Sequence, residues 1–430
     1  MNPTLTLHLG LFFDGTGLNL YNSEEGATQS RAQGSYAMGR SNVARLFALY
    51  RQSPDIPGTA DRASLALYIE GVGTTRGAAD DLMAQACGRG ASGVAARVAQ
   101  VPAQVGEALR RLLEANPGVR IAAIEVDLFG FSRGAAAARH LANDLEALTQ
   151  ACGGYPLRLN FVGLFDTVAS IMAPLKGNFS AANADFDGLR TQLPAGLARQ
   201  RVQLVAADEW RVNFPLVATD VDLALPGDHC DIGGGYRAEE DEVLVLERPF
   251  SSTEPAHLAL EQTQAWRLAS ACLERQRQAW EALGLRLYLD SESVAQPFLP
   301  KRDLYREKRV RVRIRGERRV RGELSLVYLR LMHALACAAG VPFDPVPDSA
   351  ELALPEELRP IAARLLAHGL AQRPGHGLDA AQMALLRRRY IHLSAHWNAT
   401  LHSDSPLLDA LFINRPQADR QRVIHADPPA

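Results

Sequence analysis

The stretch that decides the fold is Val126-Asp-Leu-Phe-Gly-Phe-Ser-Arg-Gly-Ala-Ala-Ala-Ala-Arg139. The apolar run 121–129 predicts a buried strand, and the alanine-rich run from Ala135 predicts a helix. Between them lies Gly130-Phe-Ser-Arg-Gly134, a G-x-S-x-G motif. A serine at a sharp strand-to-helix turn is the arrangement of a nucleophile elbow. The alternative is a glycine-rich turn in which Ser132 only caps the helix.

In a nucleophile elbow the motif residues have separate roles. Ser132 is the predicted nucleophile, held at the tip of the turn in a strained backbone conformation. Gly130 and Gly134 are predicted to let the turn tighten and the helix pack close to the strand. The backbone amide of Arg133 lies at the helix N-terminus, so we expect it to face a developing oxyanion.

Composition sets limits on the class of protein. The 430 residues are 47% hydrophobic and 22% charged, which suits one large globular domain or two. A formal net charge of −2 gives no global field that would favour nucleic acid. The five cysteines are scattered without a C-x-x-C spacing, so we expect neither a disulfide framework nor a metal site, and no cofactor. The N-terminus has no signal-peptide pattern, and no apolar run is long enough to span a membrane.

Strand patterns alternate with helical patterns as far as residue 236. Strands are predicted over 5–13, 63–69, 121–129, 157–165, 201–207 and 217–225. Helices are predicted over 41–50, 94–115, 257–285, 324–339 and 355–370. The alternation predicts an α/β-hydrolase-like core over 1–236, a mainly parallel sheet with helices on both faces. Residues 237–430 are predicted to be a mostly helical lid and C-terminal region that completes the fold.

The segment 301–321 is strongly basic, with eleven lysines and arginines against three acidic residues. Within it Val310-Arg-Val-Arg-Ile-Arg315 alternates with a period of two, which predicts a strand with one basic face. One interpretation is a solvated edge strand whose charges block unwanted pairing. The other is attraction to an anionic membrane, with Arg311, Arg313 and Arg315 as the membrane contacts.

A serine nucleophile needs a base, and the base needs an acid that orients it. In α/β-hydrolases the acid and then the histidine follow the serine, each just past a strand. Asp166 ends the predicted strand after the elbow, and His229 lies beyond a later strand. The alternatives are an Asx-turn or helix cap for Asp166 and a loop histidine bonded to backbone for His229.

Other residues compete for these roles. His392 and His396 are rival bases on a predicted helix, whereas His140 in the elbow helix is expected to pack or to face solvent. Asp231 is the rival acid, and its alternative role is to hold the His229 loop in place.

A second oxyanion donor is expected from a loop after a neighbouring strand. The turn Asp14-Gly15-Thr16 follows the predicted strand 5–13, at the edge where open α/β sheets bind ligands. Glycine permits close approach, so the amide of Gly15 or Thr16 is the candidate donor and Asp14 a supporting residue. The alternative is a plain turn.

Five segments in order carry a resemblance to a known family. They are Phe12-Phe-Asp-Gly-Thr-Gly17, Glu70-Gly-Val-Gly-Thr74, Gly130-Phe-Ser-Arg-Gly-Ala135, Gly163-Leu-Phe-Asp-Thr-Val168 and Pro226-Gly-Asp-His-Cys-Asp-Ile-Gly-Gly-Gly-Tyr236. Together they resemble the α/β-hydrolase family that includes the first family of type VI secretion lipase effectors. Ala206-Ala-Asp-Glu-Trp-Arg211 and Tyr390-Ile-His-Leu-Ser394 also look like that branch.

The resemblance implies a function and partners. It implies a phospholipase of the A type that hydrolyses glycerophospholipid acyl esters with a Ser-Asp-His triad, which falls on Ser132, Asp166 and His229. It also implies delivery to a rival bacterium's periplasm on a secretion spike protein, and an immunity protein that protects kin. The expected partners are therefore phospholipid, a membrane surface, the spike and the immunity protein. The competing hypotheses are an esterase or thioesterase of small soluble esters and a catalytically silent scaffold of a secretion complex.

Overall fold

A computed structural model describes residues 4–29, 32–172, 178, 180–297, 306–373, 375–398 and 413–427. Its centre is a six-stranded sheet in the order β2-β1-β3-β4-β5-β7, in which every neighbouring pair runs parallel. The strands are β1 (Thr4–Phe13), β2 (Arg62–Ile69), β3 (Arg120–Phe131), β4 (Leu157–Phe165), β5 (Gln200–Ala206) and β7 (Asp222–Leu225). The predicted parallel α/β sheet is confirmed. Its central strands are buried on both faces, which explains their continuous apolar runs.

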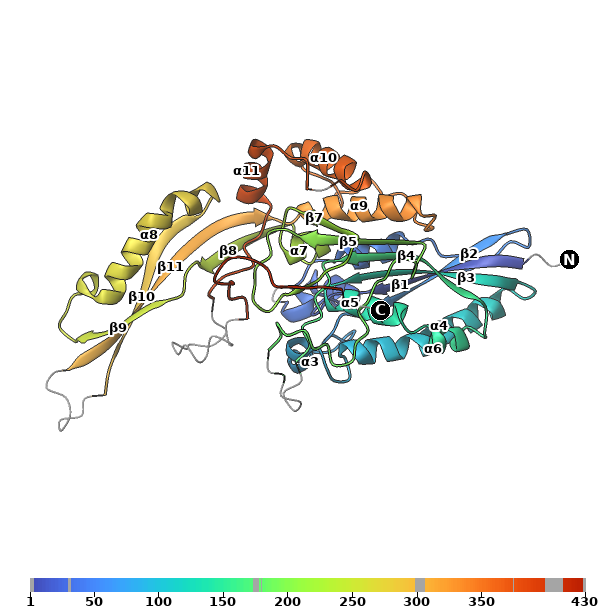
Figure 1. Cartoon of the computed structure of the whole chain (residues 1–430), viewed down its shortest axis with the longest axis horizontal. Coiled ribbons are helices and arrows are strands. Elements are labelled where there is room, and N and C mark those ends of the chain that lie inside the picture. Colours follow the sequence, from blue (N-terminus) through green and yellow to red (C-terminus); the bar gives the residue numbers. More distant parts are fainter. Residues whose placement is uncertain are drawn as a thin grey trace.

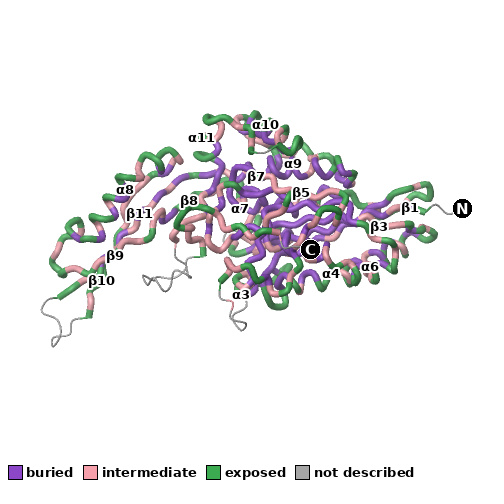
Figure 2. The backbone as a smooth tube through the Cα atoms, viewed as in Figure 1, coloured by how far each residue is buried: buried purple, intermediate pink, exposed green. Residues whose placement is uncertain are grey.

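Helices cover both faces of this sheet (Figure 1). One face carries α4 (Val94–Ala115), α5 (Arg133–Ala142) and α6 (Glu146–Ala151). The other carries α2 (Asn42–Leu49), α9 (Leu324–Ala338) and α10 (Arg359–Leu370). Shorter helices are α1 (Leu20–Gly26), α3 (Leu82–Cys87), α7 (His229–Gly233) and α11 (Ala380–Arg389). Figure 2 shows that the buried residues concentrate in the sheet and the inner sides of the helices packed on it.

The C-terminal helices belong to the core of the main sheet. Leu331 and Leu335 of α9 and Leu365 of α10 share one apolar cluster with Phe12 of β1 and Phe129 of β3. Burying these side chains removes apolar surface from water on the face that α2 covers only in part. Residues beyond 236 therefore complete the core begun by the first part of the chain.

Residues 239–321 also build a second sheet, which is antiparallel and projects from the main body (Figure 1). Its strands are β8 (Glu239–Val245), β9 (Phe250–Pro255), β10 (Arg286–Ala295) and β11 (Glu307–Arg321). Helix α8 (Gln264–Ala282) packs on it, with Ala269 and Trp280 against Val310 and Ile314. We call this unit the arm. The sequence predicts only one of its strands, because charged residues dominate β8 and hide its alternation.

The interpretation of the basic strand as an edge strand is wrong. β11 is a central strand, since β10 pairs along one side and β8 and β9 along the other. Arg313 and Arg315 lie 3.2 and 2.8 Å from the Asp290 carboxylate. Arg311 lies 3.7 Å from Glu292, and its side chain is only 12% exposed. These arginines are ion-paired within the arm and form no free cationic face. The first five residues of the basic segment lie outside the described residues.

Among the residues that the structure describes, no helix has both the length and the apolar character needed to cross a bilayer.

Candidate active site

The serine of the motif occupies a strained turn. β3 ends at Phe131 and α5 begins at Arg133, with Ser132 between them at φ 58° and ψ −126°. A positive φ is unfavourable for a residue with a Cβ, so the surrounding structure must hold it. The Ser132 amide donates to the Phe165 carbonyl at 3.1 Å, and the Val168 amide donates to the Ser132 carbonyl at 3.4 Å. These bonds tie the elbow to the end of β4.

The two glycines of the motif allow the elbow helix to approach the sheet. A Cβ on Gly130 would lie 2.6 Å from the Cα of Ala135. A Cβ on Gly134 would lie 2.3 Å from the carbonyl oxygens of Phe13 and Asp14. Neither contact leaves room for a larger residue, so both glycines are required by close packing.

Asp166 and His229 meet behind the elbow. Asp166 directly follows β4, and His229 begins α7 after β7. The Nδ1 atom of His229 lies 2.5 Å from the Asp166 Oδ2, and both side chains are buried. The His229 ring packs against Phe131, the residue before Ser132, with ring centroids 4.6 Å apart. The Ser132 hydroxyl makes no hydrogen bond to a described residue, and catalytic hydrogen bonds are often long until substrate binds.

The electrostatics of this pair suit a neutral histidine. Burial lowers the pKa of His229 below its usual value, and the bond to Asp166 opposes that shift. Burial alone would raise the pKa of Asp166, but the charge of Arg422 and the bond to His229 hold it well below its usual range. A charged aspartate beside a neutral imidazole is the state that a general base requires.

Arg422 is the site residue that sequence reasoning missed. Its Nη1 and Nη2 atoms donate to the two Asp166 oxygens at 2.6 and 2.7 Å, and its Nε donates to the Phe214 carbonyl at 2.8 Å. The Asp166 Oδ1 also accepts from the Ala206 amide at 2.9 Å. A fork-to-fork pair fixes the plane of the carboxylate as well as its charge. No local pattern could reveal a contact between residues 256 positions apart.

Arg422 is delivered by residues 413–427, which we call the C-terminal strap. Its strand β12 (Ile424–His425) pairs in parallel with β6 (Leu216–Val217). At its end the Asp427 carboxylate accepts from the buried guanidinium of Arg139 in the elbow helix at 2.7 Å. The strap therefore touches both the candidate acid and the helix that follows the candidate nucleophile.

The predicted oxyanion donors differ in whether they already have a hydrogen-bond partner. The Gly15 amide donates to the Asp14 Oδ1 at 2.7 Å, so the prediction that it is a free donor is wrong. Asp14 also accepts from the Tyr68 hydroxyl at 2.5 Å and thereby fixes this turn. The hydroxyl of Thr16 is buried with no hydrogen-bond partner in the described chain. Arg133 opens α5, where backbone amides have no partner within the helix.

The rival residues are engaged elsewhere. The Nδ1 atom of His392 lies 2.7 Å from Asp231 Oδ1, and the His392 amide donates to Oδ2 at 3.0 Å. Asp231 also forms a capping box with Asp228 at the start of α7. It therefore holds the loop that carries His229. Burial lowers the pKa of His396 to about 4, and the His140 Nδ1 accepts from the Arg190 amide at 3.1 Å.

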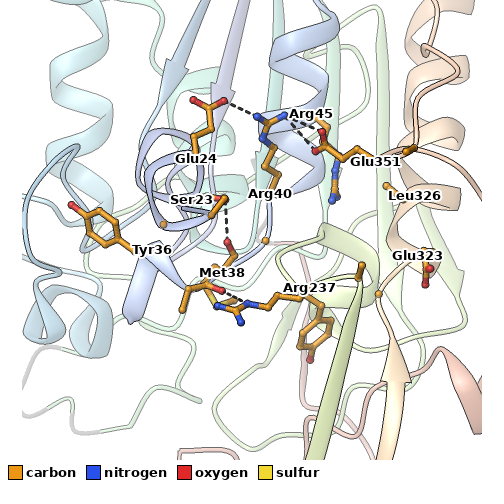
Figure 3. Close-up of a pocket in the computed structure, with 18 of the residues that line it drawn as sticks. Ser23, Glu24, Tyr36, Met38, Arg40, Arg45, Arg237, Glu323, Leu326 and Glu351 are labelled. Carbon is orange, nitrogen blue, oxygen red and sulfur yellow. Dashed lines mark hydrogen bonds and ion pairs between the residues drawn. The ribbon is translucent and has the colours of Figure 1, made fainter. Parts of the chain in front are cut away.

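The structure has a pocket of about 590 Å³, whose lining is drawn in Figure 3. Its lining includes Arg40, which pairs with Glu24 at 2.8 Å and with Glu351 at 3.4 Å. Ser132, Asp166 and His229 are not in its lining. Ion pairs across its wall make it a poor fit for an acyl chain. Within the described ranges no group of three or more histidine, cysteine or acidic side chains is arranged to hold a metal.

Comparison with known proteins gives a match to a family model and a match to a solved structure. Residues 8–153 match the family model for the catalytic domain of Tle1-like phospholipase effectors of the type VI secretion system. The whole chain superposes on a solved structure of the Tle1 effector bound to the VgrG spike, with a TM-score of 0.80 and 26% identity over 99% of this chain and 94% of that one. The chain is similar to the Tle1-like lipase effectors in sequence and in fold. The resemblance predicted from the ordered motifs is confirmed.

The comparisons also gave a second, weaker structural match and one search without a match. An uncharacterized protein from Pseudomonas aeruginosa matches with a TM-score of 0.46 and 20% identity, over 89% of this chain and 53% of that one. No curated protein matches the chain. The Tle1-like match covers the second half of β1, all of β2 and β3, and the elbow, so it includes Ser132.

Proposed function

We propose that the chain is a phospholipase of the A type that hydrolyses acyl esters of glycerophospholipids with Ser132, His229 and Asp166. The observation that carries the proposal is the 2.5 Å contact between His229 and Asp166 beside a strained serine at a strand-to-helix turn. The match of residues 8–153 to Tle1-like phospholipase catalytic domains supports the same substrate class.

The proposed reaction has two halves. The Ser132 Oγ attacks the acyl carbonyl while the His229 Nε2 accepts its proton, and the tetrahedral oxyanion lies against the Arg133 amide. His229 then gives the proton to the departing lysophospholipid oxygen, which leaves an acyl-serine ester. Water attacks that ester with His229 again as base, and the fatty acid leaves. Thr16 is the proposed second oxyanion residue, since its buried hydroxyl has no partner among the described residues.

The proposed role of Asp166 is to orient His229. A carboxylate that bonds the His229 Nδ1 selects the tautomer whose Nε2 can accept a proton. Arg422 holds that carboxylate in one plane through two hydrogen bonds. We therefore propose Arg422 as a positioning residue for the catalytic acid.

Delivery is a separate part of the proposal. The Tle1 effector of the solved structure is bound to the VgrG spike, and this chain covers nearly all of it. We propose that the chain travels on a secretion spike protein to the periplasm of a target bacterium, and that an immunity protein restrains it in kin. Membrane contact through Arg311, Arg313 and Arg315 is not part of the proposal, because they are ion-paired.

The test is product identification. Purified protein is incubated with vesicles of defined phosphatidylethanolamine and phosphatidylglycerol, and released acyl chains are identified by mass spectrometry. We expect free fatty acid and lysophospholipid in equal amounts. Hydrolysis of short soluble esters alone would indicate an esterase instead. Failure of a fluorophosphonate probe to label Ser132 would indicate a silent scaffold.

A further inference from the structure

Arg133 is a partly exposed residue whose guanidinium has one buried nitrogen without a hydrogen-bond partner among the described residues. Its Nη1 atom is inaccessible to water and makes no hydrogen bond to any described residue. No carboxylate of the described chain lies within ion-pair distance of it. Its side chain lies against Gly88, where an added Cβ would be 3.4 Å from Arg133 Cδ and Nη1. Burial lowers the pKa of Arg133 to about 10, so the group stays charged at neutral pH.

Three other arginines around the site are paired with carboxylates. Arg139 lies 2.7 Å from Asp427, Arg211 lies 2.6 Å from Glu209, and Arg422 lies 2.6 Å from Asp166. Burying a guanidinium without an anion is costly, and pairing offsets the cost. A buried guanidinium nitrogen without an acceptor among the described residues, next to the candidate nucleophile, therefore calls for an anion that arrives with the ligand.

We propose that the Arg133 guanidinium binds the phosphodiester of the substrate while the Ser132 hydroxyl attacks its acyl ester. The inference rests on the proposed function and adds the residue that recognises phosphate. In a glycerophospholipid the phosphorus lies only a few bonds from the acyl esters. Ser132 and Arg133 are adjacent, so the candidate nucleophile and the cation are carried by the same strand-to-helix turn. A guanidinium fork matches two phosphate oxygens, which gives geometric selection as well as charge.

Helix α3, which lies next to Arg133, favours a bilayer lipid as the source of that phosphate. Helix α3 ends at Gly88, the residue against the Arg133 side chain. At its other end Leu82 and Met83 are 72% and 71% exposed. The helix has six residues and so is about 9 Å long. Figure 1 shows it on the side of the sheet that carries α4 and α5. Exposed apolar side chains one short helix away from a cation fit the boundary between acyl chains and headgroups.

The test compares two substrates with the same acyl chains, a phosphatidylglycerol and a diacylglycerol, in mixed micelles of one neutral detergent. The readout is the ratio of their kcat/KM values. We expect Arg133→Gln to lower the ratio about 10- to 100-fold, as loss of a charge-assisted hydrogen bond does. Arg133→Lys should give an intermediate ratio, because it keeps the charge and loses the fork. Arg89→Gln is the matched control and should keep the wild-type ratio, since Arg89 is exposed and pairs with Asp187 at 3.2 Å.

The outcomes separate the inference from the function on which it rests. An unchanged ratio in folded Arg133→Gln protein overturns the phosphate site, even if both substrates are hydrolysed. If wild-type protein hydrolyses neither substrate, the proposed function itself fails. Replacing Leu82 and Met83 by serine should slow hydrolysis of vesicles and spare a monomeric short-chain phospholipid. Equal rates on vesicles would assign the site to a soluble phosphodiester and overturn the bilayer source.

Discussion

Removing the guanidinium that holds the candidate acid is the most informative perturbation of this site. Arg422→Gln deletes the two bonds, of 2.6 and 2.7 Å, that Arg422 donates to Asp166. Both side chains are buried, with Arg422 7% exposed and Asp166 fully covered. Breaking one side of such a pair costs about 3–5 kcal/mol of stability. We expect the lower part of that range, because His229 and the Ala206 amide still bind the carboxylate.

Arg422→Gln should also shift the pH dependence of kcat/KM. A substitution that only loosened the packing of the site would leave that pH dependence in place. The Arg422 Nη2 and the His229 Nδ1 both bond the Asp166 Oδ2, at 2.7 and 2.5 Å, so the two nitrogens are at most about 5 Å apart. At an effective dielectric constant near 20, two positive charges about 5 Å apart repel by roughly 3 kcal/mol. Removing Arg422 should therefore raise the pKa of His229, because the protonated imidazole loses a positive neighbour.

The assay is kcat/KM against pH, whose acidic limb reports the base of the free enzyme. For Arg422→Gln that limb should move to higher pH, because a histidine that binds its proton more tightly loses base function sooner as pH falls. Arg422→Lys keeps the charge and is the matched control, with a limb near the wild-type position. A folded Arg422→Gln protein whose acidic limb coincides with wild type would refute the role of Arg422.

Three further outcomes follow from the geometry. Gly134→Ala should cost about 1–3 kcal/mol in urea unfolding, because the added methyl meets two carbonyl oxygens at 2.3 Å; an unchanged midpoint would contradict the close packing of the elbow helix. His392 has a pKa raised to about 9 despite burial, through Asp231, so its pairing should stabilise the fold fully below pH 6.5 and be lost as pH rises through 9. His392→Gln should therefore flatten a decline on the order of 3 kcal/mol across that window. Asp427→Asn should lower the melting temperature, since it leaves the buried Arg139 without its anion; the exposed Asp419→Asn is the control.

The sequence could predict those strands and helices whose buried residues form a continuous apolar run or a regular helical spacing. The strand 157–165 and the helix 94–115 have the bounds expected from their apolar residues. In the arm the sequence predicts only part of β11, from the alternation of 310–315. It does not predict the partner strand β10, because acidic side chains that pair with the β11 arginines replace apolar residues along it. The apolar side of the arm, including Val310 and Ile314, becomes meaningful only once α8 is known to cover it.

The candidate site divides in the same way. Ser132, Asp166 and His229 each follow a predicted strand in the order that a hydrolase requires, so spacing alone could nominate them. The state of the Gly15 amide could not be foreseen, because it depends on which way the Asp14 carboxylate turns. Arg422 could not be nominated either, since its contact with Asp166 depends on the path of the C-terminal strap.

The central claim is that Ser132 and His229 act as one catalytic unit on phospholipid. The most direct measurement is the rate of fatty acid release from phospholipid vesicles by wild type, Ser132→Ala, His229→Ala and the double variant, each with an unchanged melting curve. We predict that either single change lowers kcat about a million-fold and that the double variant is no slower than the singles, because triad members act together. Substantial release by folded Ser132→Ala, or losses that multiply in the double variant, would contradict the assignment.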